Sequence, residues 1–401
     1  MVITWSTLCP SRIAYVRYGT GFLSEVVKGH STEFIDGGEQ KRKIYIHRVF
    51  LTELIEETKY YYKCFNEENE SKQYSFTTLK NGSDWSPRIA VIGDLGLHNA
   101  KSAPLLMKLV SENKFDILFH NGDFGYDLDW ENGKVGDAFL RFIEPIAARV
   151  PYMTSPGNHE EKYNFSNYDN RFTMIDEKTR CKNNHFHSFN IGPAHIISFS
   201  TEFYFFTNYG SQQIATQYEW LKNDLMEANL PENREKRPWV ITFGHRPMYC
   251  SGDRDECHEK RNIVREGIRR GSKQKRVYGL EELFYENKVD IAFWAHQHSS
   301  ERSWPVYNNT VYNGSTDTPY INPKAPVHII SGNAGNNENL SEFDDFQPKW
   351  SAKRILDFGF VQMTVLSKKE ILIQQVSATT ENVIDEFRIM KNIEQNSGAV
   401  F

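Results

Sequence analysis

Five strand-like segments of the chain each end in side chains of the kind that bind metal ions. Helix-like segments such as "NAKSAPLLMKLVSEN" separate several of them, so the sequence predicts βαβ units and a largely parallel sheet. Ligands gather at the carboxyl ends of the strands in such sheets, so we expect these side chains to share one rim. The segment ends are Asp94 in "RIAVIGD", Asp123 in "FDILFHNGD", Asn158 and His159 in "PYMTSPGNHE", His245 in "WVITFGH", and His296 and His298 in "VDIAFWAHQH".

The spacing within these segment ends supports one shared site. His296 and His298 are separated by one residue, so in an extended segment both side chains point to the same side. A glycine stands before four of the polar residues, where a missing Cβ lets the chain turn sharply and approach an ion or a phosphate. These glycines are Gly93, Gly122, Gly157 and Gly244. One Gly-Asp pair would carry little weight, whereas five segments together indicate a site.

The ligand types indicate two different metal ions. Cysteine is missing from the set, which argues against zinc-finger or iron–sulfur chemistry. Carboxylate oxygens and the phenolate of Tyr126, three residues after Asp123, suit a hard trivalent cation, while the amide oxygen of Asn158 with imidazoles suits a divalent ion. Two neighbouring metals form the clamp used for in-line displacement at phosphorus. Taken alone, Tyr126 would be interpreted as a core tyrosine.

The first 80 residues follow a different pattern. Short alternating runs such as "RIAYVRYG" and "KIYIHRVFLTEL" are rich in β-branched and aromatic residues, which predicts an antiparallel β-sandwich. The stretch "KNGSDWSP" breaks the pattern and marks the boundary. We therefore expect a sandwich domain at 1–83, a catalytic domain with its C-terminal strands at 84–390, and a frayed tail at 391–401. Helices are expected at 99–113, 136–150, 211–229 and 280–288, and the basic stretch 265–276 is interpreted as a solvated loop.

Composition excludes some classes of partner. A net charge of −5 over 401 residues gives no diffuse positive field for nucleic acid, and no window approaches the run of apolar residues that a membrane helix requires. Of five cysteines, Cys250 and Cys257 lie close together in one polar loop and are the disulfide candidates.

The start of the chain leaves the compartment open. "MVITWSTLCPSR" reads as a strand and lacks the features of a signal peptide, so the chain is either cytosolic or N-terminally incomplete. Glycosylation sequons give weak support for export; they stand at Asn69, Asn81, Asn164, Asn308, Asn313 and Asn339.

The blocks "GDLG", "GDFGY", "GNHE", "TFGH" and "AHQH" resemble those of the purple acid phosphatases, in the binuclear metallophosphoesterase superfamily. The stretches "GHRPMYCS" and "WAHQHSSERSWP" resemble the animal, high-molecular-weight branch. The resemblance covers residues 1 to about 390. It implies a fibronectin type III-like sandwich followed by an α/β (α+β) metallophosphoesterase sandwich, with mixed β-sheets flanked by helices.

The resemblance also assigns the ligands. Fe(III) would be held by Asp94, Asp123, Tyr126 and His298. A divalent ion, Zn, Fe or Mn, would be held by Asp123, Asn158, His245 and His296, with Asp123 as the bridge. The chain departs from the family pattern at Thr242 and Ala295, neither of which is a ligand, and it offers only His258 where some members carry a His-His pair.

The activity implied by the resemblance is that of an acid phosphatase, in which a metal-bound hydroxide attacks a small phosphate monoester. His159 is expected to face the phosphate, with Glu160 orienting it, and His258 is the candidate general acid. Two alternatives stay open: a phosphodiesterase acting on nucleotide or lipid head-group diesters, and an interaction module whose catalytic domain has decayed. The resemblance further implies secretion or a lysosomal location, and it leaves a homodimer open.

Overall fold

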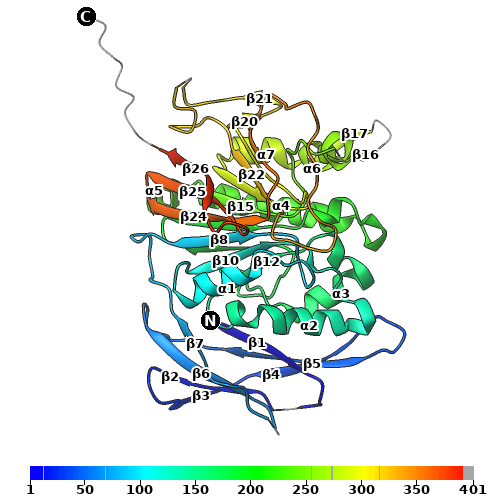
Figure 1. The fold of residues 1–401 in the computed structure, drawn as a ribbon, viewed down its shortest axis with the longest axis vertical. Helices are drawn as coiled ribbons and strands as arrows, with labels where there is room; N and C mark the ends of the chain where they lie inside the picture. Colours follow the sequence, from blue (N-terminus) through cyan, green and yellow to red (C-terminus); the bar gives the residue numbers. More distant parts are fainter. Residues whose placement is uncertain (12, 68, 254, 272–273, 316, 392–401) are drawn as a thin grey trace, which may run out of the picture.

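The structure is a computed structural model in which residues 1–391 are described, apart from 12, 68, 254, 272–273 and 316 (Figure 1). The tail expected at 391–401 lies, except for Lys391, outside the described residues. Among the described residues, no helix combines the length and apolar character needed to cross a membrane.

The N-terminal domain is a sandwich of two antiparallel sheets, as the alternating pattern predicted. One sheet has the strand order β1-β5-β4 and the other β3-β2-β6-β7. In β6, alternate side chains Tyr60, Tyr62 and Cys64 point into the core between the sheets. The strands are β1 Val2–Thr7, β2 Tyr15–Gly19, β3 Glu25–Lys28, β4 His30–Ile35, β5 Lys43–Phe50, β6 Lys59–Phe65 and β7 Tyr74–Thr77.

Two mixed sheets form the centre of the second domain, which confirms the expected fold class. In the first sheet, three parallel strands are followed by three antiparallel ones from the C-terminal part of the chain, in the order β12-β10-β8-β24-β25-β26. These strands are β8 Arg88–Ile92, β10 Ile117–Asn121, β12 Tyr152–Ser155, β24 Gly359–Ser367, β25 Glu370–Ser377 and β26 Val383–Met390.

The second sheet has four parallel strands at its centre and antiparallel strands at both edges. Its order is β13-β14-β15-β18-β22-β19-β23. The strands are β13 His187–Ile191, β14 Ala194–Ser198, β15 Trp239–Phe243, β18 Ile291–Trp294, β19 Ser300–Ser303, β22 Val327–Ser331 and β23 Ser351–Ile355.

Helices cover the outer faces of both sheets, so the domain has four layers (Figure 1). Helices α1, α2 and α3 lie between the first sheet and the sandwich, and α4 and α7 lie over the second sheet. Phe119 and Phe243 stack between the two sheets, with ring centroids 4.8 Å apart, in the central apolar core. The helices are α1 Ala103–Ser111, α2 Trp130–Ala147, α3 Lys162–Arg171, α4 Gln212–Ala228, α5 Pro231–Lys236, α6 Arg261–Glu266 and α7 Leu280–Glu286.

The layered arrangement places the loops after β8, β10, β12, β15 and β18 together, because parallel strands present their carboxyl ends at one edge. A two-stranded sheet then fixes the first two loops side by side. In it, β9 (Leu95–Gly96) pairs with β11 (Phe124–Gly125). Asp94 stands immediately before β9 and Asp123 immediately before β11, so this pairing fixes the two aspartates relative to each other.

Some sequence expectations about secondary structure were wrong. The stretch 265–276 is not a simple loop, because β16 (Gly267–Arg270) and β17 (Lys275–Tyr278) pair within it as a hairpin. Helix α2 begins at Trp130 rather than near 136, although positive φ angles at Glu131, Asn132 and Gly133 separate its first turn from the rest. The remaining short pair, β20 (Val306–Tyr307) and β21 (Thr310–Val311), was not expected.

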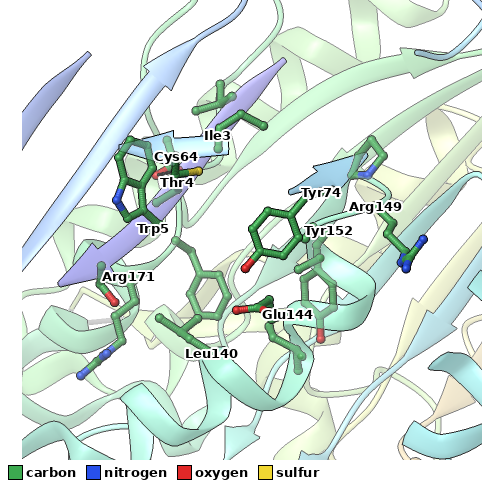
Figure 2. Close-up of a pocket in the computed structure, with 18 of the residues that line it drawn as sticks. Ile3, Thr4, Trp5, Cys64, Tyr74, Leu140, Glu144, Arg149, Tyr152 and Arg171 are labelled. Carbon is green, nitrogen blue, oxygen red and sulfur yellow. Dashed lines mark hydrogen bonds between the residues drawn. The ribbon is translucent and has the colours of Figure 1, made fainter. Parts of the chain in front are cut away.

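The sandwich packs against α2, and the contact encloses a cavity of about 390 Å³ (Figure 2). Trp5 and Tyr74 of the sandwich face Leu140 and Glu144 of α2 across it. Beside it, Asp137 of α2 pairs with Arg42 from the sandwich and with Arg171 of α3, whose Nη1 donates to Asp137 Oδ1 at 2.8 Å. β7 ends at Thr77 and β8 begins at Arg88, and the domain boundary at 83 stays a prediction between them.

Candidate metal centre

The seven predicted metal ligands converge at the rim formed by the two sheets. Asp94 follows β8, Asp123 and Tyr126 follow β10, Asn158 follows β12, His245 follows β15, and His296 and His298 follow β18. Asp94, Asp123, Tyr126, His245 and His298 are buried, whereas Asn158 and His296 are partly exposed. The cluster is therefore closed on one side and open to solvent on the side of Asn158 and His296.

Asp94, Tyr126 and His298 make up the buried half of the cluster. The phenol oxygen of Tyr126 lies 2.9 Å from His298 Nε2 and 3.3 Å from Asp94 Oδ1. The distance from His298 Nε2 to Asp94 Oδ1 is 3.4 Å. Burial, with help from Asp94 and Asp123, raises the pKa of the Tyr126 phenol well above its ordinary value. A phenolate at this position therefore needs a strongly charged cation beside it.

Asp123, His245 and His296 form the second half, and their ligand atoms all lie within 4.8 Å of one another. Asp123 Oδ2 is 3.2 Å from His245 Nε2, which is also 3.1 Å from the amide oxygen of Asn158. Burial raises the pKa of Asp123, but His245 and His159 outweigh it and hold the pKa well below the usual range. Asp123 is thus a carboxylate, as a bridging ligand has to be.

Two of the histidines are oriented by backbone carbonyl groups. His245 Nδ1 lies 2.7 Å from the carbonyl oxygen of Asn121, and His298 Nδ1 lies 2.9 Å from that of Asn339. A carbonyl only accepts, so each Nδ1 carries the ring proton and donates it. The Nε2 atoms of both rings therefore point into the cluster, where each can bind a metal ion once it carries no proton. The donor set fits a pair of ions.

The backbone at the rim is strained. Four of the seven predicted ligands have positive φ angles, which L-residues rarely adopt: 59° at Asp94, 60° at Asp123, 50° at Tyr126 and 67° at His296. Such conformations persist only where the surrounding structure fixes them, and they cluster at functional sites. The strain is therefore independent support for a functional role of this rim.

The glycines before the ligands have a steric reason. A Cβ at Gly157 would lie 2.2 Å from Asp123 Oδ1, and one at Gly122 would lie 2.6 Å from His245 Nδ1. Gly122 also has a φ angle of +88°. Side chains at these two positions would displace Asp123 and His245, so the close approach of the strands depends on glycine.

Glu160 does not orient His159, contrary to the expectation. Its buried carboxylate instead accepts backbone N–H groups from Asp123, Phe124 and Gly157 at 2.8–2.9 Å. Burial and the neighbouring Asp123 raise its pKa to about 8. Glu160 therefore ties the loop after β12 to the loop after β10.

His159 lies at the open side of the cluster and is oriented by Asp127. Its Nδ1–H donates to Asp127 Oδ1 at 2.5 Å, and its Nε2 lies 4.0 Å from Asp123 Oδ2 and 3.7 Å from Glu338 Oε1. Burial lowers the pKa of this imidazole, but Asp123 and Asp127 outweigh burial and raise it to about 10. His159 can therefore offer a proton at Nε2 to a ligand on the exposed side.

The structure does not bring His258 to the cluster. Its side chain is 51% exposed, and its Nε2 lies 3.4 Å from Asp344 Oδ2. Among the described residues, His258 makes no hydrogen bond or ion pair with any of the seven predicted ligands. The expected Cys250–Cys257 disulfide is formed, and His258 follows it directly, in the helical turn Glu256–Lys260.

Three further residues at the rim were missed in the sequence. Asp127 stands directly after Tyr126 and Arg246 directly after His245, so their positions beside predicted ligands were the available signal. Glu338 lies 4.0 Å from His298 Nε2, yet nothing in its local sequence marks it. It comes from the loop after β22, which only the fold brings to this rim.

Known families match most of the chain. Residues 87–300 match the family described as Calcineurin-like phosphoesterase, and residues 325–386 match Iron/zinc purple acid phosphatase-like protein C. Residues 1–78 match Purple acid Phosphatase, N-terminal domain. The chain belongs to the purple acid phosphatase family. The resemblance seen in the five blocks is thereby confirmed.

Individual purple acid phosphatases resemble the chain over nearly its full length. Acid phosphatase type 7 of Homo sapiens is 46% identical over 396 residues, covering 98% of this chain and 88% of that protein. The Danio rerio protein of the same name is 45% identical, with the same coverage of both chains. The solved structure of purple acid phosphatase PPD1 from yellow lupin superposes with a TM-score of 0.76 at 25% identity, covering 97% of this chain and 72% of that one. As a purple acid phosphatase, the protein is a phosphoesterase hydrolase.

Proposed function

We propose that this purple acid phosphatase hydrolyses small phosphate monoesters at acid pH, using a binuclear Fe(III)–M(II) centre, with M being Zn, Fe or Mn. The observation that carries the proposal is the division of one cluster into two unlike halves around Asp123. Asp94, Tyr126 and His298 offer a carboxylate, a phenol and an imidazole, whereas Asn158, His245 and His296 offer an amide and two imidazoles. The first set suits a trivalent ion and the second a divalent one.

The two ions would supply charge neutralisation of the phosphate and activation of water at acid pH. The protein supplies the path by which the substrate reaches the centre and the proton for the leaving oxygen. Because Asn158, His159 and His296 are the partly exposed members of the rim, the substrate would enter on their side. The buried side of Asp94 and Tyr126 excludes water from behind the centre.

His159 is the group best placed to assist the leaving oxygen. Asp127 holds its Nδ1–H, which directs Nε2 toward the space between Asp123 and Glu338. The raised pKa keeps this imidazole protonated under acid conditions, so Nε2–H can donate to the ester or to a phosphate oxygen. His258 stays a prediction for the general acid, and its role would require the helical turn Glu256–Lys260 to approach the rim.

One set of measurements on the purified protein tests this proposal. Iron and one divalent metal should be found near stoichiometric amounts, and the oxidised protein should show a visible phenolate-to-Fe(III) band. Hydrolysis of para-nitrophenyl phosphate should be fastest below neutral pH. The Tyr126→Phe variant should lose the band and keep part of the activity, and a colourless, iron-replete wild type would contradict the ligand assignment.

The same preparation separates the alternatives. Faster turnover of bis-para-nitrophenyl phosphate than of the monoester would indicate a phosphodiesterase. A protein that folds but retains neither metal nor activity would indicate an interaction module with a decayed catalytic domain. The complete ligand set is evidence against that last outcome.

We also propose that the protein is exported, either by secretion or to the lysosome. The Cys250–Cys257 disulfide supports it, because such bonds persist mainly in oxidising compartments. The sequon residues Asn69, Asn81, Asn164 and Asn308 are all exposed, as acceptors of glycans have to be. A mobility shift on glycosidase treatment of the protein from animal cells tests this, and an unchanged mobility would count against it.

A further inference from the structure

Arg246 is the one arginine or lysine of the described residues that hydrogen-bonds a predicted metal ligand. Its Nη1 donates to Nε2 of His296 at 2.9 Å. A guanidinium has donors only, so Nε2 has to be the acceptor, and in a neutral ring Nδ1 then carries the proton. In this arrangement neither nitrogen of His296 has a lone pair free for a metal ion.

For His296 to bind a metal ion, Arg246 would therefore have to give up its hydrogen bond to His296. If Nε2 is the ligand atom, its lone pair cannot also accept from Nη1. If Nδ1 is the ligand atom, the ring proton moves to Nε2, which then faces Nη1 as donor against donor. In both cases the Nη1 contact would break if His296 bound a metal ion.

The rest of Arg246 is held in place independently of His296. Its Nε donates to Glu202 Oε2 at 3.0 Å, and Glu202 is fully buried. The guanidinium carbon also lies 4.3 Å from the ring centroid of Phe205. Only 12% of the Arg246 side chain is exposed, so release from His296 would leave the Nη edge at the open side of the rim.

We propose that Arg246 is a substrate-binding residue whose freed Nη edge binds the phosphate oxygens of the monoester beside His296. The inference rests on the proposed function. A guanidinium edge matches two phosphate oxygens and stays charged at any working pH. It would also add a permanent positive charge beside Asp94 and Asp123, which contact no arginine or lysine among the described residues.

Two variants and one matched control test the proposal. Arg246→Lys keeps a charge beside Glu202 but loses the forked edge. The double variant Arg246→Leu with Glu202→Gln removes the edge without leaving Glu202 buried and unpaired. The control is Arg302→Leu, because Arg302 is similarly buried, donates from Nε to Asp385 at 2.6 Å and lies 4.7 Å from the ring of Phe387, away from the rim.

Each metal-loaded protein is assayed for kcat and KM on para-nitrophenyl phosphate and for the inhibition constant of inorganic phosphate. Zinc affinity is measured separately by competition with a chelator. In both Arg246 variants we expect KM and the phosphate inhibition constant to rise by about 10- to 100-fold, the range of a lost hydrogen bond to a charged group. Zinc affinity should be unchanged or higher, because a competitor for His296 is removed. Arg302→Leu should keep the wild-type constants.

The outcomes separate this inference from the proposed function. If the wild type is active and both Arg246 variants keep its KM and inhibition constant, the inference about Arg246 is wrong. If both variants instead lose zinc affinity in step with activity, Arg246 only supports the fold of the rim, and the inference is wrong again. If the wild type binds zinc but neither hydrolyses the monoester nor responds to phosphate, the proposed function fails and the inference fails with it.

Discussion

The candidate metal-ligand rim and the cavity between the two domains both lie beside buried charge, but they are built in opposite ways. At the rim, Asp94 and Asp123 are buried together on a strained backbone. At the domain contact, the buried charge of Asp137 has two arginine partners, and the remaining lining is largely aromatic and aliphatic. The two carboxylates of the rim face histidines and contact no arginine or lysine among the described residues, whereas the carboxylate at the domain contact is paired with two arginines.

The largest expected effect is on activity at the rim. Asp123→Ala removes the proposed bridging carboxylate, so kcat/KM should fall by about 10³-fold or more, since metal-ion catalysis supplies several kcal/mol. The metal-free variant should also unfold at a lower temperature than the metal-free wild type, because His245 and His159 lose the carboxylate that they face. Steady-state kinetics and calorimetry on both proteins measure kcat/KM and the unfolding temperature. A loss of stability without a loss of turnover would mean that Asp123 serves the fold and not the reaction.

The next effect should appear in stability and not in activity. Asp137→Ala leaves Arg42 and Arg171 without their shared carboxylate, and removing one partner of a buried pair costs about 3–5 kcal/mol. Denaturant unfolding should show this loss, while KM and kcat measured well below the melting temperature should match the wild type. Impaired turnover in the still-folded variant would mean that the domain contact influences the rim.

A third difference concerns histidines. The pKa of His159 is raised at the rim, whereas the pKa values of two other histidines are lowered where the ring is buried away from it. Carboxylates at the rim raise the pKa of His159 to about 10, whereas away from the rim burial lowers the pKa of His187 to about 4 and of His328 to about 3. Below pH 6.5, the unfolded chain binds protons on His187 and His328 that the folded chain does not. The contribution of these two neutral histidines to the free energy of unfolding is therefore complete above about pH 6.5, and it is lost as the pH falls toward 4.

Replacing one of these histidines measures that contribution. In His187→Leu, the free energy of unfolding should depend less steeply on pH between about 6 and 4.5, by up to about 1.4 kcal/mol per pH unit for one proton. Urea titrations at several pH values, on the wild type and the variant, give the two slopes. Equal slopes would show that the acid sensitivity originates elsewhere.

The smallest effect is expected in the cavity itself. Glu144 pairs with Lys72 at 2.6 Å, but the two side chains are 35% and 68% exposed. Exposed pairs contribute little, so Glu144→Gln should change stability by no more than about 1 kcal/mol and leave kinetics untouched. A thermal melt is sufficient to check it. A large loss would mean that the cavity depends on this charge.

The sequence predicted the rim well because its signals are local. Gly-Asp pairs at Asp94 and Asp123, and the spacing of His296 and His298, mark strand ends whatever surrounds them. The role of Glu160 could not be predicted, because its carboxylate bonds the loop after β10, which lies far away in sequence. Glu338 was missed for the same reason.

Errors in the predicted secondary structure also have physical causes. The charge of 265–276 suggested a solvated loop, but Gly267 pairs opposite Tyr278 just outside that stretch and starts a hairpin. A pairing of this kind depends on the partner strand more than on composition. The four helices expected from apolar periodicity correspond to α1, α2, α4 and α7, whereas α3, α5 and α6 were not expected. The early start of α2 at Trp130 was also missed, because positive φ angles interrupt its first turn.

The left-handed backbone at Asp94, Asp123, Tyr126 and His296 has a consequence for protein engineering. Each such residue stores roughly 1–2 kcal/mol of torsional energy that glycine would release. A library screened only for heat tolerance would therefore enrich changes such as Asp94→Gly, and each winner would lose a candidate metal ligand. Thermostabilisation of this phosphatase has to be selected together with turnover, or the screen will remove its candidate metal ligands.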